Sequence, residues 1–566
     1  MKTFLLHILL AFSFFCTAQQ RYYSDPMKIP LLLSGSFAEL RSNHFHSGID
    51  IKTQGVTGLP VYAVADGYIS RIAVSPTGYG KALYINHPNG TTSVYGHLNK
   101  FSPEVEKYVK DKQYEKKSFR VDLQIPSFLF PVKQDEEIAK SGNTGSSGGP
   151  HLHFEIRDTP TEEPLNPLLF GFPVTDNIQP KVFSVLLVPL TKNSFVEDSP
   201  TAKSYPVVFY DGQYHLKNNP TIPVWGEIGI AIQTNDYFDG TYNKCGINLL
   251  RMSVNDEEQF TFTLNRFSFS DTRYLNSHIV YSELKAAKRR YIKTWLESGN
   301  KLPIYTHNGT EGRISPKNNE TEKVQIELQD SYKNMSLLSF SIIGKEKKPD
   351  TDSVPATIHF AFNKTNSYRN DSVSLNIPNG ALYTDFEFEY RTEPASDKFF
   401  TDYHFFHNNT VPLHKNARFA LRVDSLPEQL QSKVIMAYVH PITGEYTAAG
   451  GSYKDGWVST ESRNLGVYAV TVDTIPPEII PLSIAENKLT ESSRIRFKIK
   501  DDFAGIKSIE GLLDGKWALF EYDPKTATIT HYFDKDRFEL GKNHTFKLTI
   551  TDYRNNNSVY EARFWK

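Results

Sequence analysis

His151-Leu152-His153-Phe154-Glu155-Ile156 alternates polar and apolar side chains over six residues. A period of two predicts a strand with His151, His153 and Glu155 on one face and the apolar side chains facing a core. Two imidazoles side by side on a strand suit a metal site, in which one ligates and its neighbour lies near a metal-bound water. A solvated strand face with two incidental histidines fits the same pattern. The stretch alone therefore predicts a strand but not its chemistry.

Further strands are predicted on the N-terminal side of this stretch. Residues 61–74 predict a strand, a turn at Asp66-Gly67 and a second strand. Pro88-Asn89-Gly90 predicts a hairpin between Lys81–Asn86 and Thr92–Leu98. The region is therefore expected to form an antiparallel β domain.

One segment of this domain has a different character. Ser102 as N-cap, Pro103 as first helical residue and Glu104 predict the start of a charged helix. We interpret residues 101–130 as an insertion into the β domain. It is long enough to form a groove wall, a lid or a partner dock, and a lid over the site would make an enzyme latent.

Three other motifs contain candidate functional residues. His46-Ser47-Gly48-Ile49-Asp50 has a His-x-x-x-Asp spacing, and Tyr95-Gly96-His97-Leu98 ends a predicted strand. Each motif alone is weak evidence for a site. A surface histidine near a turn aspartate explains the His46 motif equally well, and a packed histidine explains the His97 motif. The glycine-rich segment Ser141–Gly149 lacks a phosphate-loop pattern. It predicts a backbone that lets a strand or substrate approach closely.

Taken in order, these motifs resemble the lysostaphin-type (LytM-like) zinc metallopeptidases, a family of peptidoglycan endopeptidases. The resemblance covers roughly Leu33 to Arg157, about a quarter of the chain. It rests on Asn43–Asp50, Gly58–Gly67, Tyr95–Leu98, Gly142–Gly145 and Pro150–Glu155.

The resemblance implies a fold, a cofactor and roles for five residues. His46, Asp50 and His153 would ligate one zinc ion, leaving a fourth position for water or the scissile carbonyl. His97 and His151 would be the unligated catalytic pair, which orients and deprotonates the water and stabilises the tetrahedral intermediate. The implied substrate is the peptide cross-link of bacterial peptidoglycan.

Composition excludes some other functions. The 566 residues include 63 Lys+Arg and 64 Asp+Glu, for a formal charge of -1. This balance argues against a nucleic-acid binder that works by bulk charge. The only cysteines are Cys16 and Cys245. A thiolate zinc cluster is therefore excluded, and a His/Asp site is the kind this chain can build.

The N-terminus predicts export. Lys2, the apolar run Phe4–Phe15 and the small residues of Cys16-Thr17-Ala18 predict a signal peptide over residues 1–18. A lipoprotein acylated on Cys16 is the alternative, but the bulky Phe14 and Phe15 disfavour it. No later apolar run approaches the roughly 18 residues of a membrane span. We expect a periplasmic, cell-surface or extracellular protein.

The predicted fold class is mostly β, with a LytM-like antiparallel β-sheet peptidase domain followed by several Ig-like β-sandwich domains. The expected boundaries are residues 19–172 for the peptidase domain, 177–345 for a β-sandwich with a helical insertion near 283–297, 354–472 for a β-rich domain, and 474–566 for an Ig-like β-sandwich.

Two of these later domains share sequence patterns. Asp330-x-x-x-Asn334-x-Ser336 has the spacing of Asp552-x-x-x-Asn556-x-Ser558. Matching segments also occur in the entry linkers 176–180 and 473–477, and in 230–240 and 499–505. The Asp/Asn pairs are interpreted as turn caps, with calcium binding as the alternative.

Two other functions remain open at this point. A catalytically inactive LytM-like module could act as a cell-wall binding, activator or scaffold protein, and metal analysis would distinguish it. A structural surface protein dominated by its β domains is the other. The expected partners are a peptidoglycan peptide, and a protein or glycan at the C-terminal β domains. Nucleic acid and an integral membrane segment after signal cleavage are not expected.

Overall fold

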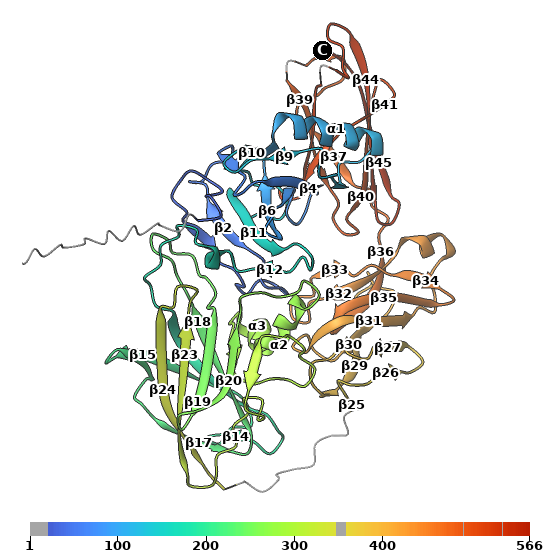
Figure 1. The fold of residues 1–566 in the computed structure, drawn as a ribbon. Helices are drawn as coiled ribbons and strands as arrows, with labels where there is room; N and C mark the ends of the chain where they lie inside the picture. Colours follow the sequence, from blue (N-terminus) through green and yellow to red (C-terminus); the bar gives the residue numbers. More distant parts are fainter. Residues whose placement is uncertain (1–20, 347–357, 491, 535) are drawn as a thin grey trace, which may run out of the picture.

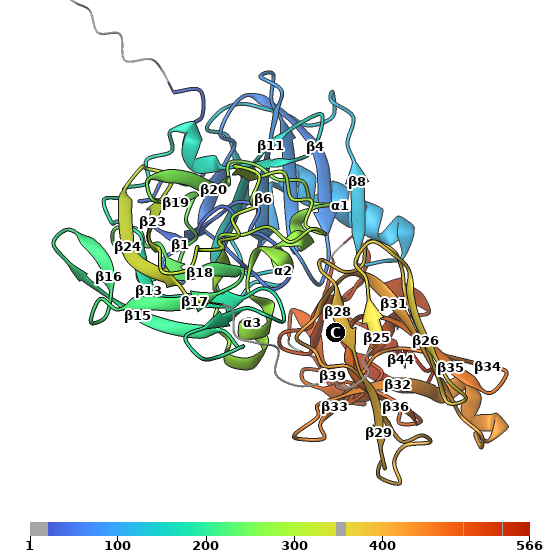
Figure 2. The same ribbon diagram turned by 90° about the horizontal axis from the view of Figure 1, so that it is seen from below.

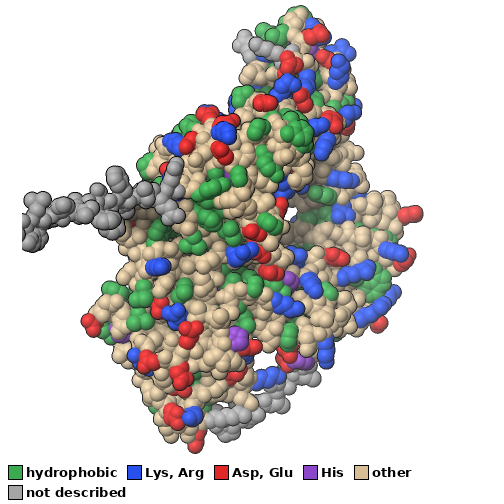
Figure 3. Space-filling view, viewed as in Figure 1, with side chains coloured by type: hydrophobic (Ala, Val, Ile, Leu, Met, Phe, Trp, Pro, Cys, Tyr) green, Lys and Arg blue, Asp and Glu red, His purple; other side chains and the backbone are tan. Residues whose placement is uncertain are grey.

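The computed structural model describes residues 21–346, 358–490, 492–534 and 536–566 (Figure 1). The predicted signal peptide over residues 1–18 lies outside these ranges. The fold is mostly β, as predicted, and is built around four main hydrophobic cores. None of the helices in the described ranges has the length and apolar character that a bilayer crossing needs. Acidic and basic side chains occur on every part of the face shown in Figure 3, in keeping with the near-neutral charge.

The first domain (β1–β12) contains a main sheet in which β11 (His151–Asp158) is an interior strand between β2 (Ile49–Lys52) and β6 (Thr91–Leu98). Leu152, Phe154 and Ile156 of β11 are fully buried, as the alternation predicted. The predicted hairpin is confirmed, because β5 pairs with β6 in antiparallel register. In sheet order, the main strands are β1 Leu33–Gly35, β2 Ile49–Lys52, β11 His151–Asp158, β6 Thr91–Leu98, β5 Lys81–Asn86, β4 Gly67–Val74 and β8 Val121–Gln124.

Residues 61–74 form two strands, but these strands do not pair with each other. β3 (Pro60–Tyr62) pairs with β10 (Glu137–Lys140), which also pairs with β7 (Lys100–Phe101), whereas β4 belongs to the main sheet. Residues 63–65 between them are all buried and do not alternate. The chain passes there from one sheet to the other through the core.

The predicted helix is α1 (Pro103–Lys116), and it begins at Pro103 as expected. Ser102 occupies the N-cap position, but its side chain makes no capping hydrogen bond. Val105 and Val109 bury one side of the helix in the core of the first domain. The opposite side therefore remains available for another part of the chain.

The second domain (β13–β24) packs twelve strands around one core. Its predicted helical insertion is shorter than residues 283–297, because α3 ends at Ala287 and residues 292–293 form β21 against β18. Its main elements are β13 Lys181–Pro189, β15 Lys203–Tyr210, β18 Ile228–Asn235, β19 Leu249–Val254, β20 Glu257–Thr263, α2 Leu275–His278, α3 Tyr281–Ala287, β23 Thr321–Gln329 and β24 Met335–Gly344.

The third domain (β25–β36) and the fourth domain (β37–β45) each pack two main sheets on a shared core. In the third these are β26 Asn366–Arg369, β27 Val373–Ile377, β31 Pro412–Arg422, β35 Trp457–Asn464 and β34 Ser452–Lys454 on one side, and β29 Tyr390–Glu393, β30 Tyr403–Phe406, β36 Gly466–Val472, β32 Val434–Val439 and β33 Tyr446–Ala448 on the other. In the fourth they are β37 Glu478–Pro481, β39 Arg494–Lys500, β43 Thr528–Tyr532 and β42 Glu521–Asp523, against β38 Lys488–Leu489, β45 Asn557–Trp565, β44 Asn543–Asp552, β40 Ile506–Leu513 and β41 Lys516–Ala518.

Each domain contacts the next one along the chain, and the fourth returns to the first (Figures 1 and 2). The four domains thus close into a ring. Representative contacts at the junctions, in chain order, are Phe45 N donating to Thr272 Oγ1 at 2.7 Å, Tyr274 stacked on His414 at 4.2 Å, Tyr446 against Phe503 at 5.2 Å, and Trp517 against Tyr114 at 5.2 Å.

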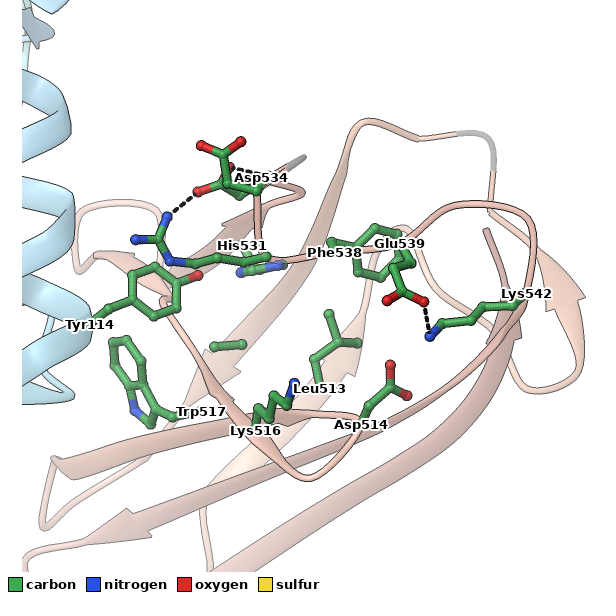
Figure 4. A pocket seen from close by; sticks show the side chains of 13 residues that line it. Tyr114, Leu513, Asp514, Lys516, Trp517, His531, Asp534, Phe538, Glu539 and Lys542 are labelled. Atoms are coloured by element: carbon green, nitrogen blue, oxygen red, sulfur yellow. Dashed lines mark hydrogen bonds and ion pairs between the residues drawn. The ribbon is translucent and has the colours of Figure 1, made fainter.

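The insertion closes this ring, because the exposed side of α1 contacts the fourth domain. Lys110 Nζ lies 2.9 Å from Asp534 Oδ2, and Arg537 lies over the Tyr114 ring at 4.4 Å. Figure 4 shows Tyr114 beside Trp517 at one end of a pocket of about 390 Å³. The insertion thus contacts this chain's own fourth domain, and the groove wall, lid and partner dock considered for it stay predictions.

We expect Tyr114→Ala to loosen this junction. It removes one aromatic contact and one cation–π contact, together worth about 1–2 kcal/mol, so the undocked population should rise roughly tenfold. Hydrogen exchange of the α1 amides should become faster. The control is Lys112→Ala, because Lys112 pairs with Glu115 of the same helix at 2.7 Å. Equal exchange in the two variants would contradict the prediction.

Candidate active site

Strand register brings the predicted site residues together. Asp50 of β2 lies directly opposite His153 of β11, and His153 lies opposite Gly96 of β6 on its other side. The rings of His97 and His151 lie 4.8 Å apart between their centroids. The five residues gathered in this way are His46, Asp50, His97, His151 and His153.

Three of them converge on one point. His46 Nε2 lies 3.0 Å from Asp50 Oδ1, His153 Nδ1 lies 2.9 Å from the same oxygen, and the two nitrogens are 3.1 Å apart. Tetrahedral zinc with bonds of about 2.0–2.1 Å holds its donors about 3.3 Å apart. All three side chains are buried. The three donors therefore fit a metal ion of zinc's size.

In His46 and His153, the ring nitrogen that faces away from Asp50 also supports a metal site. His46 Nδ1 donates to the carbonyl of Ser36 at 2.7 Å, and His153 Nε2 donates to Glu155 Oε1 at 2.7 Å. The remaining nitrogen of each ring is therefore the one that points at Asp50. Histidine ligands in metal sites are usually fixed in this way. Burial lowers the pKa of His153, but Asp50 and Glu155 raise it to about 9, so a metal must displace a proton there.

Glu155 is the centre of a buried polar network and is fully inaccessible to solvent. Its Oε1 accepts hydrogen bonds from Ser47 Oγ at 2.5 Å and Tyr79 Oη at 2.6 Å, and its Oε2 accepts one from Arg157 Nε at 2.6 Å. Burial opposes the charge, yet Arg157 and His153 hold the pKa of Glu155 well below its usual range. This residue is therefore a charged support for His153, not a solvated side chain.

Asp50 is held by a basic side chain as well as by the histidines. Arg41 Nη2 donates to Asp50 Oδ2 at 2.9 Å, which leaves Oδ1 for the point shared with His46 and His153. Burial raises the pKa of Asp50, but the histidines outweigh it and hold that pKa well below its usual range. The carboxylate is thus ionised and ready to ligate.

His97 and His151 lie beside each other, and the ring of each is fixed by a hydrogen bond to a backbone carbonyl. Their Nδ1 atoms donate to the carbonyls of Thr144 at 2.9 Å and Gly149 at 2.8 Å, which leaves Nε2 free on each ring. His151 Nε2 lies 3.4 Å from Asp50 Oδ1. Burial and the two neighbouring histidines lower the pKa of His97 to about 3, so its imidazole is neutral. The pair therefore lies beside the three converging donors, with each Nδ1 bound to a backbone carbonyl.

Comparison with known proteins agrees with this geometry. Residues 44–114 match peptidase family M23. The match lies within the first domain, which is called the M23 domain below. Residues 357–473, which span the third domain, match the Zu5-like domain.

Similar proteins occur in several bacteria. An uncharacterized metalloprotease of Haemophilus influenzae is 33% identical over 132 residues, which are 23% of this chain and 22% of that protein. A DD-carboxypeptidase/endopeptidase of Neisseria meningitidis is 34% identical over 140 residues, 25% of this chain and 26% of the relative. A peptidoglycan DD-endopeptidase of Vibrio cholerae is 32% identical over 111 residues, 20% of each chain. The chain thus spans about a quarter of the length of these relatives.

Glycines allow the loops of the M23 domain to pack behind His97. Gly145 has φ +69°, and a Cβ there would lie 2.3 Å from the backbone of Gly78 and of Gly80. This is the close backbone approach that the segment Ser141–Gly149 predicted. The packing holds Thr144, whose carbonyl accepts the Nδ1 hydrogen of His97. His97 itself has φ +58°, a backbone strain of the kind that concentrates at functional sites.

Sequence reasoning missed several residues that support the site. Arg41, Ser47 and Tyr79 act through long-range contacts that no local periodicity reveals. Arg157 continues the alternation of β11 on the polar face, and this signal was available. His44, two residues from His46, is exposed and bonds only locally to the carbonyl of Ser42.

We expect Glu155→Gln to weaken both metal binding and the fold. His153 loses its charged acceptor, which typically costs 10–100-fold in metal affinity. Arg157 is left buried without its partner, which costs about 3–5 kcal/mol. Chelator competition and urea unfolding measure the two effects. Glu162→Gln is the matched control, because Glu162 is exposed and lies 3.7 Å from the same arginine. Unchanged metal affinity in Glu155→Gln would contradict the supporting role.

Proposed function

We propose that this protein is a zinc-dependent endopeptidase that cleaves peptide cross-links of bacterial peptidoglycan. One observation carries the proposal. Two imidazole nitrogens and a carboxylate oxygen converge within 3.1 Å of one another, beside two further histidines with free Nε2 atoms. The peptidoglycan DD-endopeptidase of Vibrio cholerae, similar over 111 residues, supports the substrate class.

The three converging residues would hold the metal. His46 and His153 offer imidazole nitrogens, Asp50 offers a charged oxygen, and a three-ligand set of this kind is typical of catalytic rather than structural zinc. A metal held there supplies Lewis-acid polarisation and lowers the pKa of water to about 7.

The other two histidines would handle the proton. Neutral His97, with its Nδ1 hydrogen on Thr144, can accept a proton only at Nε2. His151 has the same arrangement through Gly149, and its Nε2 faces Asp50. Once protonated, either imidazole becomes a donor to the oxyanion that forms when water attacks the amide. General base and oxyanion stabiliser are thus the roles we assign to this pair.

A cleft of about 350 Å³ runs from the loop behind His97 to the fourth domain. Lys525 donates to the carbonyl of Asn143 across it, and Lys81 Nζ lies 3.5 Å from Glu521 Oε1. We infer that the fourth domain forms one wall of the path by which a cross-linked peptide reaches the site. The cleft is lined by residues of both domains, among them Ser75, Asn143, Thr144, Arg496, Glu521 and Tyr532.

Export fits the same function. The predicted signal peptide would deliver the chain to the compartment that holds peptidoglycan, and we place the protein in the periplasm or at the cell surface. A protein or glycan partner at the later β domains remains part of the proposal.

Substitutions in the two groups of histidines should have different effects. We expect His97→Ala and His151→Ala to keep zinc and to cut turnover of purified muropeptide dimers by about 100-fold to 10,000-fold. His46→Ala should lose both zinc and activity, because it removes a ligand. Product analysis by mass spectrometry, with zinc and with chelator, measures cleavage and bond choice.

His44→Ala is the matched control and should behave as wild type, since His44 lies outside the converging group. A wild-type protein that binds stoichiometric zinc but releases no product from several peptidoglycan types would instead support the inactive-module alternative. Full activity in His151→Ala would overturn the assigned mechanism.

A further inference from the structure

A second group of buried carboxylates lies where the chain enters the second domain. Asp176 is in the linker after the M23 domain, Asp236 directly follows β18, and Asp330 directly follows β23. The three are only 8%, 1% and 3% exposed, and one oxygen from each lies within 4.8 Å of the others. Three ionised carboxylates cannot share such a space without positive charge.

Asp236 and Asp176 have carboxylate oxygens with no hydrogen-bond donor. Both oxygens of Asp236 and Oδ2 of Asp176 are buried and unpartnered. Burial and the other two carboxylates raise the pKa of Asp236 to about 9. In the part of the chain that the structure describes, no Lys, Arg or His forms an ion pair with these three aspartates. Three buried carboxylate oxygens in this group thus lack a hydrogen-bond donor.

The fourth domain provides an internal comparison. Asp473, Asp501 and Asp552 occupy matching positions in the repeated motifs, and their oxygens also lie within 4.8 Å of one another. Asp330 and Asp552 use their carboxylates identically, each capping its own Asp-x-x-x-Asn turn. The turn-cap interpretation of both pairs is therefore confirmed.

The two groups differ in how the other carboxylates are satisfied. In the fourth domain, Phe503 N and Gly505 N donate to Asp501 Oδ1, and Ala504 N donates to Asp473 Oδ2. The matching oxygens of Asp236 and Asp176 receive no donor. The same sequence pattern thus leaves carboxylate oxygens of the second domain without donors, whereas those of the fourth domain are hydrogen-bonded.

The two groups also differ in charge. Arg554 follows Asp552 by two residues. Burial lowers the pKa of Arg554, and the nearby carboxylates of Asp552 and Asp473 only partly offset that effect. The matching residue after Asp330 is Tyr332, which is neutral. The fourth domain therefore has a basic residue at this position, and the second domain has a neutral one.

We propose that Asp176, Asp236 and Asp330 bind one calcium ion at the junction between the M23 domain and the second domain. Calcium takes oxygen ligands at about 2.3–2.6 Å, so oxygens on opposite sides of the ion lie about 5 Å apart. The set contains no nitrogen or sulfur, which disfavours zinc. Three carboxylates disfavour magnesium, which proteins usually bind through one or two carboxylates.

The ion would fasten the two domains together. Phe238 and Cys245, on either side of the loop after Asp236, are buried in the core of the M23 domain, and Tyr332 packs against that core. Asn334 Nδ2 donates to the carbonyl of Asp176, which ties the linker to the Asp330 turn. Calcium bound to the three aspartates would therefore hold the M23 domain in a fixed orientation on the ring.

The test uses the full-length chain, stripped of metal with EDTA and reloaded with one equivalent of zinc. Calcium chloride is then titrated by calorimetry, and thermal unfolding of the zinc-loaded chain is followed with and without calcium. We expect one calcium ion per chain and a rise of about 5 °C or more in the unfolding midpoint at a hundredfold excess over Kd. Asp236→Asn should abolish this calcium-dependent rise.

Two comparisons keep the outcome interpretable. Without added calcium, Asp236→Asn should unfold at or above the wild-type temperature, because it removes a carboxyl group whose ionisation is opposed by burial and by the other two carboxylates; this separates loss of the site from misfolding. Asp501→Asn is the matched control and should keep the calcium response. Absence of a saturable calcium response in wild type, or its persistence in Asp236→Asn, would overturn the proposal.

Discussion

The register between β2 and β11 is the constraint on which the site depends. It places Asp50 directly opposite His153, so a carboxylate oxygen and an imidazole nitrogen meet at 2.9 Å. Side chains alternate along a strand, and a slip of one residue would send His153 to the core face. Leu152 and Phe154, both fully buried, prevent that slip because they would then face the polar network. Hydrophobic packing on one face of β11 thus fixes the chemistry on the other.

The closed ring of domains extends this constraint to the rest of the chain. α1 buries Val105 and Val109 in the M23 domain and presents Tyr114 to the fourth domain. The contact brings residues about 400 positions apart in sequence beside the loop that holds His97, as Lys525 on Asn143 shows. The later domains are therefore part of the surroundings of the site and not a separate tail. The long insertion therefore connects the M23 domain to the fourth domain.

The repeated aspartate motifs show how one sequence pattern can have two physical outcomes. Asp330 and Asp552 cap equivalent turns with equivalent hydrogen bonds. Yet Asp501 receives two backbone donors while Asp236 receives none, because the loop of the fourth domain folds back onto its carboxylate. The sequence pattern specifies the local turn. Whether the neighbouring carboxylates find hydrogen-bond donors depends on the segments that pack around the turn. For this reason the aspartates of the second domain form a candidate cation site, and those of the fourth domain do not.

The sequence alone determined the features that repeat over a few residues. The period-two alternation of β11, the helix start at Pro103 and the capped turns all follow from local preferences, and the order of short motifs identified the family. Contacts across long separations could not be obtained in that way. The pairing of β3 with β10, the docking of α1 and the support of Glu155 by Tyr79 depend on which surfaces pack together once the sheets have formed. Only the tertiary structure decides them, because side chains far apart in sequence meet there.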